Sequence, residues 1–202
     1  DTHNTAVGFH AGTAVTTGVK NTLIGSTAGD ALTIGNYNTA LGFDALSTSV
    51  DGDYNTAIGY LALRLYEDGD GDGFNTAVGA NAMGSATTAQ FNTALGYSAA
   101  GGATMTGDYN IAIGYQTGNA MTSGAQNTLI GGVAGDALTT GEQNTAIGYA
   151  ALSGETAGDR SVAIGTYALF AQNNTSNVDV YNIAIGYQAG TNVTTGTQNT
   201  II

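Results

Sequence analysis

A short pattern of polar, small and aliphatic residues recurs along the whole chain. Its core is Asn-Thr-Ala-Ile-Gly or a close variant, with a large aliphatic residue in fourth place and Gly in fifth. The period is seventeen, apart from three longer repeats that begin at Asn55, Asn92 and Ser161. A unit this short fits one turn of a β-solenoid rather than a helix pair or a propeller blade. The repeats begin at Asn4, Asn21, Asn38, Asn55, Asn75, Asn92, Asn110, Asn127, Asn144, Ser161, Asn182 and Asn199.

We therefore predict an all-β fold, a parallel β-solenoid (β-roll) of about twelve 17-residue coils that forms a single repeat domain over residues 1–202. Positions of the repeat are numbered here from its first residue, and the last residue of every repeat, including the longer ones, is called position 17. Position 4 is always a large aliphatic, position 5 is Gly in every complete repeat, and position 3 is Ala in nine of the twelve repeats. Because side chains alternate along a strand, we expect position 4 to point into the coil and positions 3 and 5 to point the other way.

Small residues repeated along one face mean that another backbone passes close by. For position 3 the sequence leaves two interpretations open, a neighbouring subunit or the opposite wall of a thin coil. Position 2 is Thr in nine repeats, and Ile111, Val162 and Ile183 replace it in the others. These replacements favour an inward-facing position 2.

The remaining positions indicate how the coils stack and turn. Stacking at about 4.8 Å would place the Asn side chains of position 1 in a ladder, each donating a hydrogen bond to the next. Aromatic residues recur at positions 6 and 17, and we expect them to stack between coils. We predict two short strands per coil, joined by a tight Gly corner and a longer polar loop. The longer repeats, which start at Asn55, Asn92 and Ser161, should carry their extra residues in that loop.

Composition excludes several functions. The chain has 3 Lys and Arg residues against 15 Asp and Glu, a formal net charge of −12, so it offers no basic surface for nucleic acid or an anionic membrane. It contains no Cys, which rules out disulfides, thiolate metal sites and cysteine nucleophiles. No apolar run approaches the length of a membrane span, so we expect no membrane insertion by this segment. The chain stops at Ile202, before the Gly that should follow in the repeat, and we expect it to be a segment of a longer fibre.

Ser161-Val-Ala-Ile-Gly and Asn110-Ile-Ala-Ile-Gly resemble the head repeats of trimeric autotransporter adhesins. The fuller unit, as in Asn144-Thr-Ala-Ile-Gly-Tyr-Ala-Ala-Leu, is also similar to repeats of phage tail-fibre-like surface proteins. The resemblance covers essentially the whole chain. It implies a left-handed β-roll, three chains side by side in a trimer, an extracellular location on a cell surface or virion, and an adhesive shaft that meets a host or glycan receptor. The adhesin unit is nearer fourteen residues, whereas this one has seventeen.

The sharpest local motif is an acidic, glycine-rich run from Glu67 to Gly73 in the first longer repeat. Alternating carboxylates can converge on one hard cation, and Asp68, Asp70, Asp72 and Gly73 match the opening of an EF-hand-like calcium loop. The twelfth position of that loop would be Gly79 instead of Glu. Two interpretations stay open, a calcium site and a solvated acidic loop. Asp51 and Asp53, in the corresponding loop one coil earlier, are weaker candidate ligands.

We expect no enzyme activity and, apart from calcium, no cofactor. His3 and His10 are the only histidines, and no Ser lies in a recognisable nucleophile motif. The favoured hypothesis is a rigid, self-associating structural and adhesive fibre segment with specificity in its variable loops. The alternatives are a subunit that pairs end to end in an extracellular filament, and a solenoid that binds ice or another surface through threonines in register.

Overall fold

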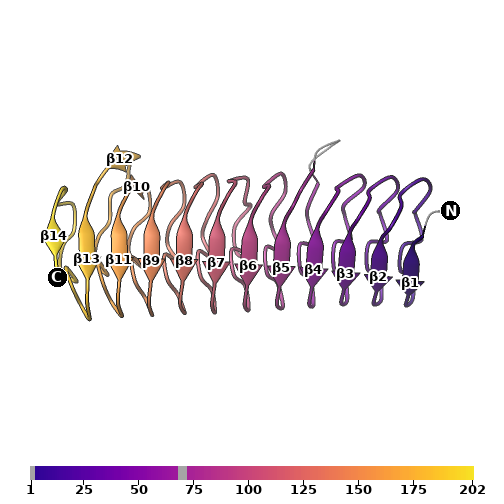
Figure 1. The fold of residues 1–202 in the computed structure, drawn as a ribbon, viewed down its shortest axis with the longest axis horizontal. Coiled ribbons are helices and arrows are strands. Elements are labelled where there is room, and N and C mark those ends of the chain that lie inside the picture. Colours follow the sequence, from indigo (N-terminus) through magenta and orange to yellow (C-terminus); the bar gives the residue numbers. More distant parts are fainter. Residues whose placement is uncertain (1–2, 68–71) are drawn as a thin grey trace.

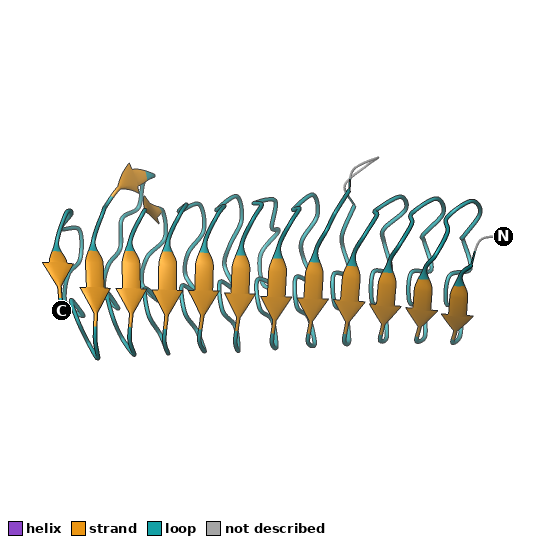
Figure 2. Ribbon diagram, in the orientation of Figure 1, coloured by secondary structure: helices purple, strands orange, loops and turns teal. Residues whose placement is uncertain are grey.

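The computed structural model describes residues 3–67 and 72–202. Each of the eleven complete repeats forms one coil of an elongated rod, the last repeat adds one strand, and the strands pair in parallel as one twelve-stranded sheet (Figures 1 and 2). The described part of the chain contains no helix able to span a membrane. The predicted parallel β-solenoid is therefore confirmed. Its sheet consists of β1 (Thr5–Val7), β2 (Thr22–Ile24), β3 (Thr39–Leu41), β4 (Thr56–Ile58), β5 (Thr76–Val78), β6 (Thr93–Leu95), β7 (Ile111–Ile113), β8 (Thr128–Ile130), β9 (Thr145–Ile147), β11 (Val162–Ile164), β13 (Ile183–Ile185) and β14 (Thr200–Ile201).

Identical repeat positions stack on one another along the whole rod. Thr5 pairs with Thr22 and, across the first of the longer repeats, Thr56 pairs with Thr76. The longest repeat also keeps its register, since Val162 pairs with Ile183. Insertions therefore leave the sheet undisturbed, as predicted. In the longest repeat, β12 (Val178–Asp179) pairs with β10 (Gly158–Asp159) of the preceding coil as a separate two-stranded sheet.

The expected orientation of the strands was wrong. Position 3 points into the coil, where Ala40 and Ala57 are fully buried, whereas position 4 points out and leaves Leu41 43% exposed. The alternation was predicted correctly but in the opposite phase. The Asn of position 1 is buried, and the period of two then places position 3 inside with it. Of the two interpretations of the small residues, the opposite wall of a thin coil is the correct one.

The prediction of two strands per coil was also wrong. Each coil has one three-residue strand, apart from the two-residue β14, and the second half of the coil consists of turns, with β10, β12 and the single bridge between Asp53 and Asp72 as exceptions in the described residues. Residues at positions 7 and 9 have left-handed backbone, for example Asp44 and Leu46 with φ of 52° and 54°. Left-handed residues alternate here with right-handed or extended ones, so the segment turns instead of extending.

The thin interior holds few large side chains, and their placement is complementary within a coil. In most coils either position 9 or position 12 is large. Leu46 at position 9 accompanies Ser49 at position 12, whereas Gly29 at position 9 accompanies Leu32 at position 12, and both leucines are fully buried. In such coils one large side chain fills the space that the small residue leaves, whereas Leu63 and Tyr66 are both fully buried in the coil that starts at Asn55.

The rare Leu residues of position 3 fill the space beside glycines of position 9. A Cβ atom on Gly118 would lie 2.9 Å from Leu129 Cδ1, and one on Gly135 would lie 3.0 Å from Leu129 Cδ2. One Leu therefore packs over the glycines of two successive coils. Leu23 has the same relation to Gly12 and Gly29.

A ladder of buried Asn side chains runs through the rod at position 1. In the middle of the ladder, Asn127 Nδ2 donates to the Gly141 carbonyl of its own coil at 2.9 Å and to Asn110 Oδ1 of the preceding coil at 3.1 Å. Asn127 Oδ1 accepts the backbone N–H of Asn144 at 2.9 Å. The predicted ladder is confirmed, and it ties each coil both to itself and to its neighbours.

Where Ser161 replaces Asn in this ladder, a buried carboxylate takes over. Glu155 is fully buried and accepts six hydrogen bonds of 2.8–3.2 Å, four from backbone N–H groups and two from side-chain amides of Gln172 and Asn174. Gln172 also donates to Ser161 Oγ at 2.9 Å, and its Oε1 accepts from Asn182 at 2.8 Å. Burial raises the pKa of Glu155, but the bonds from Asn174, Gly158 and Gln172 outweigh it and hold the pKa below its ordinary 4.5.

The Gly of position 5 cannot be replaced inside the stack. Gly131 has φ of 133°, and an added Cβ would lie 2.4 Å from the Gly148 carbonyl oxygen of the next coil. We expect Gly131→Ala to destabilise the chain by more than about 3 kcal/mol, because backbone strain adds to the clash. Gly186→Ala is the matched control, since Gly186 has φ of 131° but its Cβ would meet only Ala189, at 3.9 Å. Equal losses in thermal or denaturant unfolding would contradict the argument.

Glu155 makes part of the stability depend on pH. Its pKa is lower in the folded chain than in the unfolded one, so its contribution is present above the ordinary 4.5 and is lost as the pH falls through the folded value. Glu155→Gln places an amide donor against the donors of Gln172 and Asn174, at an expected cost of about 1–3 kcal/mol at pH 7. Denaturant unfolding of both chains from pH 7 to pH 3 should show the difference shrinking as the wild type loses this charge. A difference independent of pH would contradict this role.

Candidate interaction surfaces

The outer face of the twelve-stranded sheet is built from positions 2 and 4. Position 4 forms an unbroken row of large aliphatic side chains, half-exposed or exposed in every coil, with Val7, Leu95 and Ile185 at 58%, 46% and 41%. Position 2 adds a second row of Thr, with Ile111, Val162 and Ile183 as aliphatic members. Twelve strands spaced by about 4.8 Å make this sheet face about 53 Å long.

The sheet face contains no charged residue. Positions 1 to 6 hold no Asp, Glu, Lys or Arg in any of the twelve repeats, although the chain has a net charge of −12. The strands were predicted in the wrong phase, so this face was missed. The absence of charge from the same six positions was a signal in the sequence that could have found it, because depletion of charge is typical of the core of an interface.

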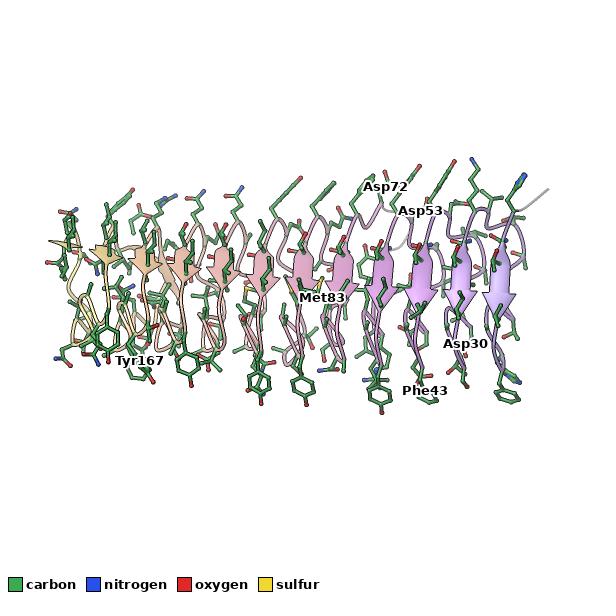
Figure 3. All side chains as sticks on the ribbon, turned by 60° about the horizontal axis from the view of Figure 1, so that its bottom comes forward. Asp30, Phe43, Asp53, Asp72, Met83 and Tyr167 are labelled. Carbon is green, nitrogen blue, oxygen red and sulfur yellow. The ribbon has the colours of Figure 1, made fainter. Side chains whose placement is uncertain are left out.

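Two rows of exposed aromatic side chains border the sheet face. The row at position 6 stacks in pairs, Phe43 with Tyr60 and Tyr97 with Tyr115, at centroid separations of 5.7 and 5.5 Å. Figure 3 shows Phe43 and Tyr167 along one edge of the sheet, with Asp53 and Asp72 towards the other. The predicted stacking between coils is confirmed for these pairs.

The row at position 17 is a continuous stack of five rings. Successive centroids are 4.8, 4.8, 5.2 and 4.9 Å apart, and the planes differ by 3–15°. We call this stack the aromatic edge, and its rings are 40–56% exposed. It consists of Tyr37, Tyr54, Phe74, Phe91 and Tyr109.

The candidate calcium ligands are only partly within the described residues. Asp68 and Asp70 lie outside them, and Asp51, Asp53 and Asp72 lie within. Asp53 pairs with Asp72 through a parallel backbone bridge, so successive coils bring these two residues side by side. The described residues contain no group of three or more His, Cys, Asp or Glu side chains arranged to hold a metal. Calcium stays a prediction.

Asp53 has an unfavourable electrostatic environment. Burial raises the pKa of its carboxyl above the ordinary 3.8, hydrogen bonds from the backbone and side chain of Asn36 oppose this, and the negative charges of Asp72 and Asp51 raise it further. Oδ1 of Asp51 is buried and accepts no hydrogen bond from the described residues. A cation here would relieve the repulsion between these carboxylates.

His10 lies at position 7 and stacks on Phe9, with ring centroids 4.0 Å apart. The described surface has no pocket, so its candidate sites are the sheet face, its aromatic borders and the acidic loops. Comparison of the chain with protein-family models, curated proteins and solved structures finds no match. These surfaces are therefore the features from which a function can be inferred.

Proposed function

We propose that this chain is a rod-shaped structural segment of an extracellular fibre, which associates side by side with copies of itself through the sheet face. The observation that supports this is the uncharged row of position-4 aliphatics, which is unbroken over all twelve strands. A soluble monomer seldom exposes a contiguous apolar patch of more than a few hundred Å². A second copy of the same chain would cover the face with an equally long and equally uncharged surface.

The size of the sheet face fits a stable interface. A length of about 53 Å and a width of roughly 13 Å, from position 2 to position 6, correspond to an area on the order of 700 Å². Stable protein interfaces bury about 800 Å² on each partner. Position 6 adds aromatic side chains at one border of this face, and aromatic residues are enriched in interfaces.

A closed side-by-side assembly buries the sheet face of every copy and leaves none exposed for further growth. Three copies around a common axis could bury their sheet faces along the whole rod and leave the acidic loops outside. The resemblance to adhesin head repeats supports the number three. The insertion of the longest repeat, with exposed Thr175, Ser176 and Asn177, is then a variable loop available to a host or glycan receptor on a cell surface or virion.

Surface binding is the second candidate function. The expected inward direction of position 2 argued against surface binding, but position 2 points outward. Its threonines and the aliphatic residues of position 4 form a regular array that faces water. Such an array could order water or bind ice as a monomer. It therefore differs from the fibre proposal in the expected mass in solution.

Light scattering behind size exclusion tests the association. We expect a mass near three chains for the wild type and a mass near one chain for Leu41→Lys/Leu95→Lys, because both leucines are already 43–46% exposed in the single chain and Lys would place charge inside the interface. Ser123→Lys/Thr197→Lys adds the same charge at exposed loop positions and should stay trimeric.

A wild-type mass of one chain at high concentration would contradict the proposal. Thermal hysteresis measured on that same sample would then test ice binding. Continuous growth with concentration would instead favour the end-to-end filament.

Calcium binding is tested by thermal unfolding with added calcium and with EDTA. We propose that Asp51, Asp53 and Asp72 contribute to a site, so calcium should raise the melting temperature of the wild type and have no effect on Asp53→Asn/Asp72→Asn. Asp30→Asn/Glu142→Gln removes the same charge elsewhere and should retain the response. Equal melting of the wild type in both conditions would show that the loop is simply solvated.

A further inference from the structure

Aromatic rings at position 17, one of them in the aromatic edge, already contact cations that belong to the chain itself. Two of the three basic residues, Lys20 and Arg160, occupy position 17, and each lies over the ring of the next coil. Lys20 Nζ is 4.7 Å from the Tyr37 ring centroid and donates a hydrogen bond of 2.9 Å to its hydroxyl. The methylene stem of Lys20 is thereby directed along the ring, with the charge at its polar end.

Arg160 makes a similar contact with an aromatic ring and has a carboxylate as an additional partner. Its guanidinium lies 5.9 Å from the Tyr181 ring centroid and forms an ion pair with Asp179. Tyr181 donates a hydrogen bond of 3.2 Å to the other oxygen of that carboxylate. A position-17 ring together with a nearby carboxylate thus accommodates a guanidinium at this edge of the rod.

Between these two places the same elements recur without a cation. Asp53 and Asp108 directly precede Tyr54 and Tyr109, and Asp72 is bridged to Asp53. Oδ1 of Asp108 accepts the backbone N–H of Gln90 at 2.8 Å, which fixes the carboxylate beside the stack. Among residues 3–67 and 72–202 the only ion pair is that of Arg160 with Asp179. Among the described residues, the middle of the aromatic edge therefore has ring edges and negative charge but no ion pair with a basic side chain.

We propose that the aromatic edge binds an extended, arginine-rich peptide segment in trans. The faces of the five rings cover one another, so the peptide meets their edges, and the three methylenes of each Arg lie across these edges while the guanidinium reaches the acids. The stack is about 20 Å long, a distance that six or seven extended residues span. Charge complementarity with a chain of net charge −12 favours this partner over an acidic or neutral one.

The test uses a fluorescent octapeptide that alternates Arg and Thr, with fluorescence anisotropy as the readout, in buffer with EDTA so that calcium does not compete for Asp53 and Asp72. A peptide of the same length with citrulline in place of Arg keeps the shape and removes the charge. We expect saturable binding of the Arg peptide, one per chain, that weakens as salt rises, and at least tenfold weaker binding of the citrulline peptide, about 1.4 kcal/mol in free energy. Equal binding of the two peptides would overturn the proposal.

Variants taken from the chain's own repeats separate ring from charge. The variant Tyr54→Gln/Phe74→Gln/Phe91→Gln removes three rings. Gln is chosen because it already occupies position 17 in other coils, with φ of 58–59° at Gln126, Gln143 and Gln198. The variant Asp53→Asn/Asp72→Asn/Asp108→Asn removes charge. Asn36 is the natural precedent, because it occupies the repeat position of Asp53 and Asp108. It accepts the backbone N–H of Val19 at 2.9 Å, as Asp108 accepts that of Gln90. Both triple variants should weaken binding at least about fivefold, because the methylene stems and the guanidinium groups of the Arg side chains contribute separately to binding.

The control variant Tyr97→Ser/Tyr115→Ser removes aromatic area from the position-6 border of the sheet. Ser26 already occupies position 6 in another coil. This variant should bind the peptide like the wild type. Loss of binding in this control, or wild-type affinity in the ring variant, would overturn the assignment and indicate general attraction to an acidic chain. Thermal unfolding checks each fold, and the single Phe91→Gln variant replaces the triple one if that one melts below the assay temperature. The assay counts peptide per chain, so it does not depend on side-by-side association.

Discussion

The buried Asn ladder is the constraint on which the rest of the structure depends. An amide inside an apolar coil must satisfy its donors and acceptor, and here the carbonyl opposite it and the neighbouring coils do so. Because position 1 is thereby held inside, the alternation of the strand places position 3 inside and positions 2 and 4 outside. The same requirement explains the network around Glu155, which supplies acceptors where Ser161 interrupts the ladder.

A thin coil follows from this arrangement and determines the chemistry of the surface. The interior has room for Ala at position 3 and for roughly one large side chain in the second half of the coil, so most large aliphatic and aromatic residues lie outside. The rod therefore exposes three parallel rows, aliphatic in the middle and aromatic at both borders, while the charged side chains of the described residues lie outside the twelve-stranded sheet. The proposed self-association and the proposed peptide binding use different parts of this one arrangement.

Much of the fold was predictable because it repeats. The regular period, the Asn ladder, the Gly corner, the stacked aromatics and the loop location of the insertions all follow from residues that recur at fixed positions. A single Asn or Gly would have been ambiguous, but the same residue in every coil indicates one geometry repeated. The single strand per coil was not predictable in this way, because left-handed backbone at positions such as Asp44 and Leu46 has no specific residue requirement.

The sequence by itself determined the architecture and the direction of the stack, since only a parallel solenoid brings identical positions of successive repeats into contact. The tertiary structure decided which face of each strand is the core. A period of two is satisfied equally by either phase, and the larger residues at position 4 favoured the wrong one. The choice depends on the volume enclosed by the coil and on partners for the buried Asn amides, and both exist only once the second half of the coil has closed over the first.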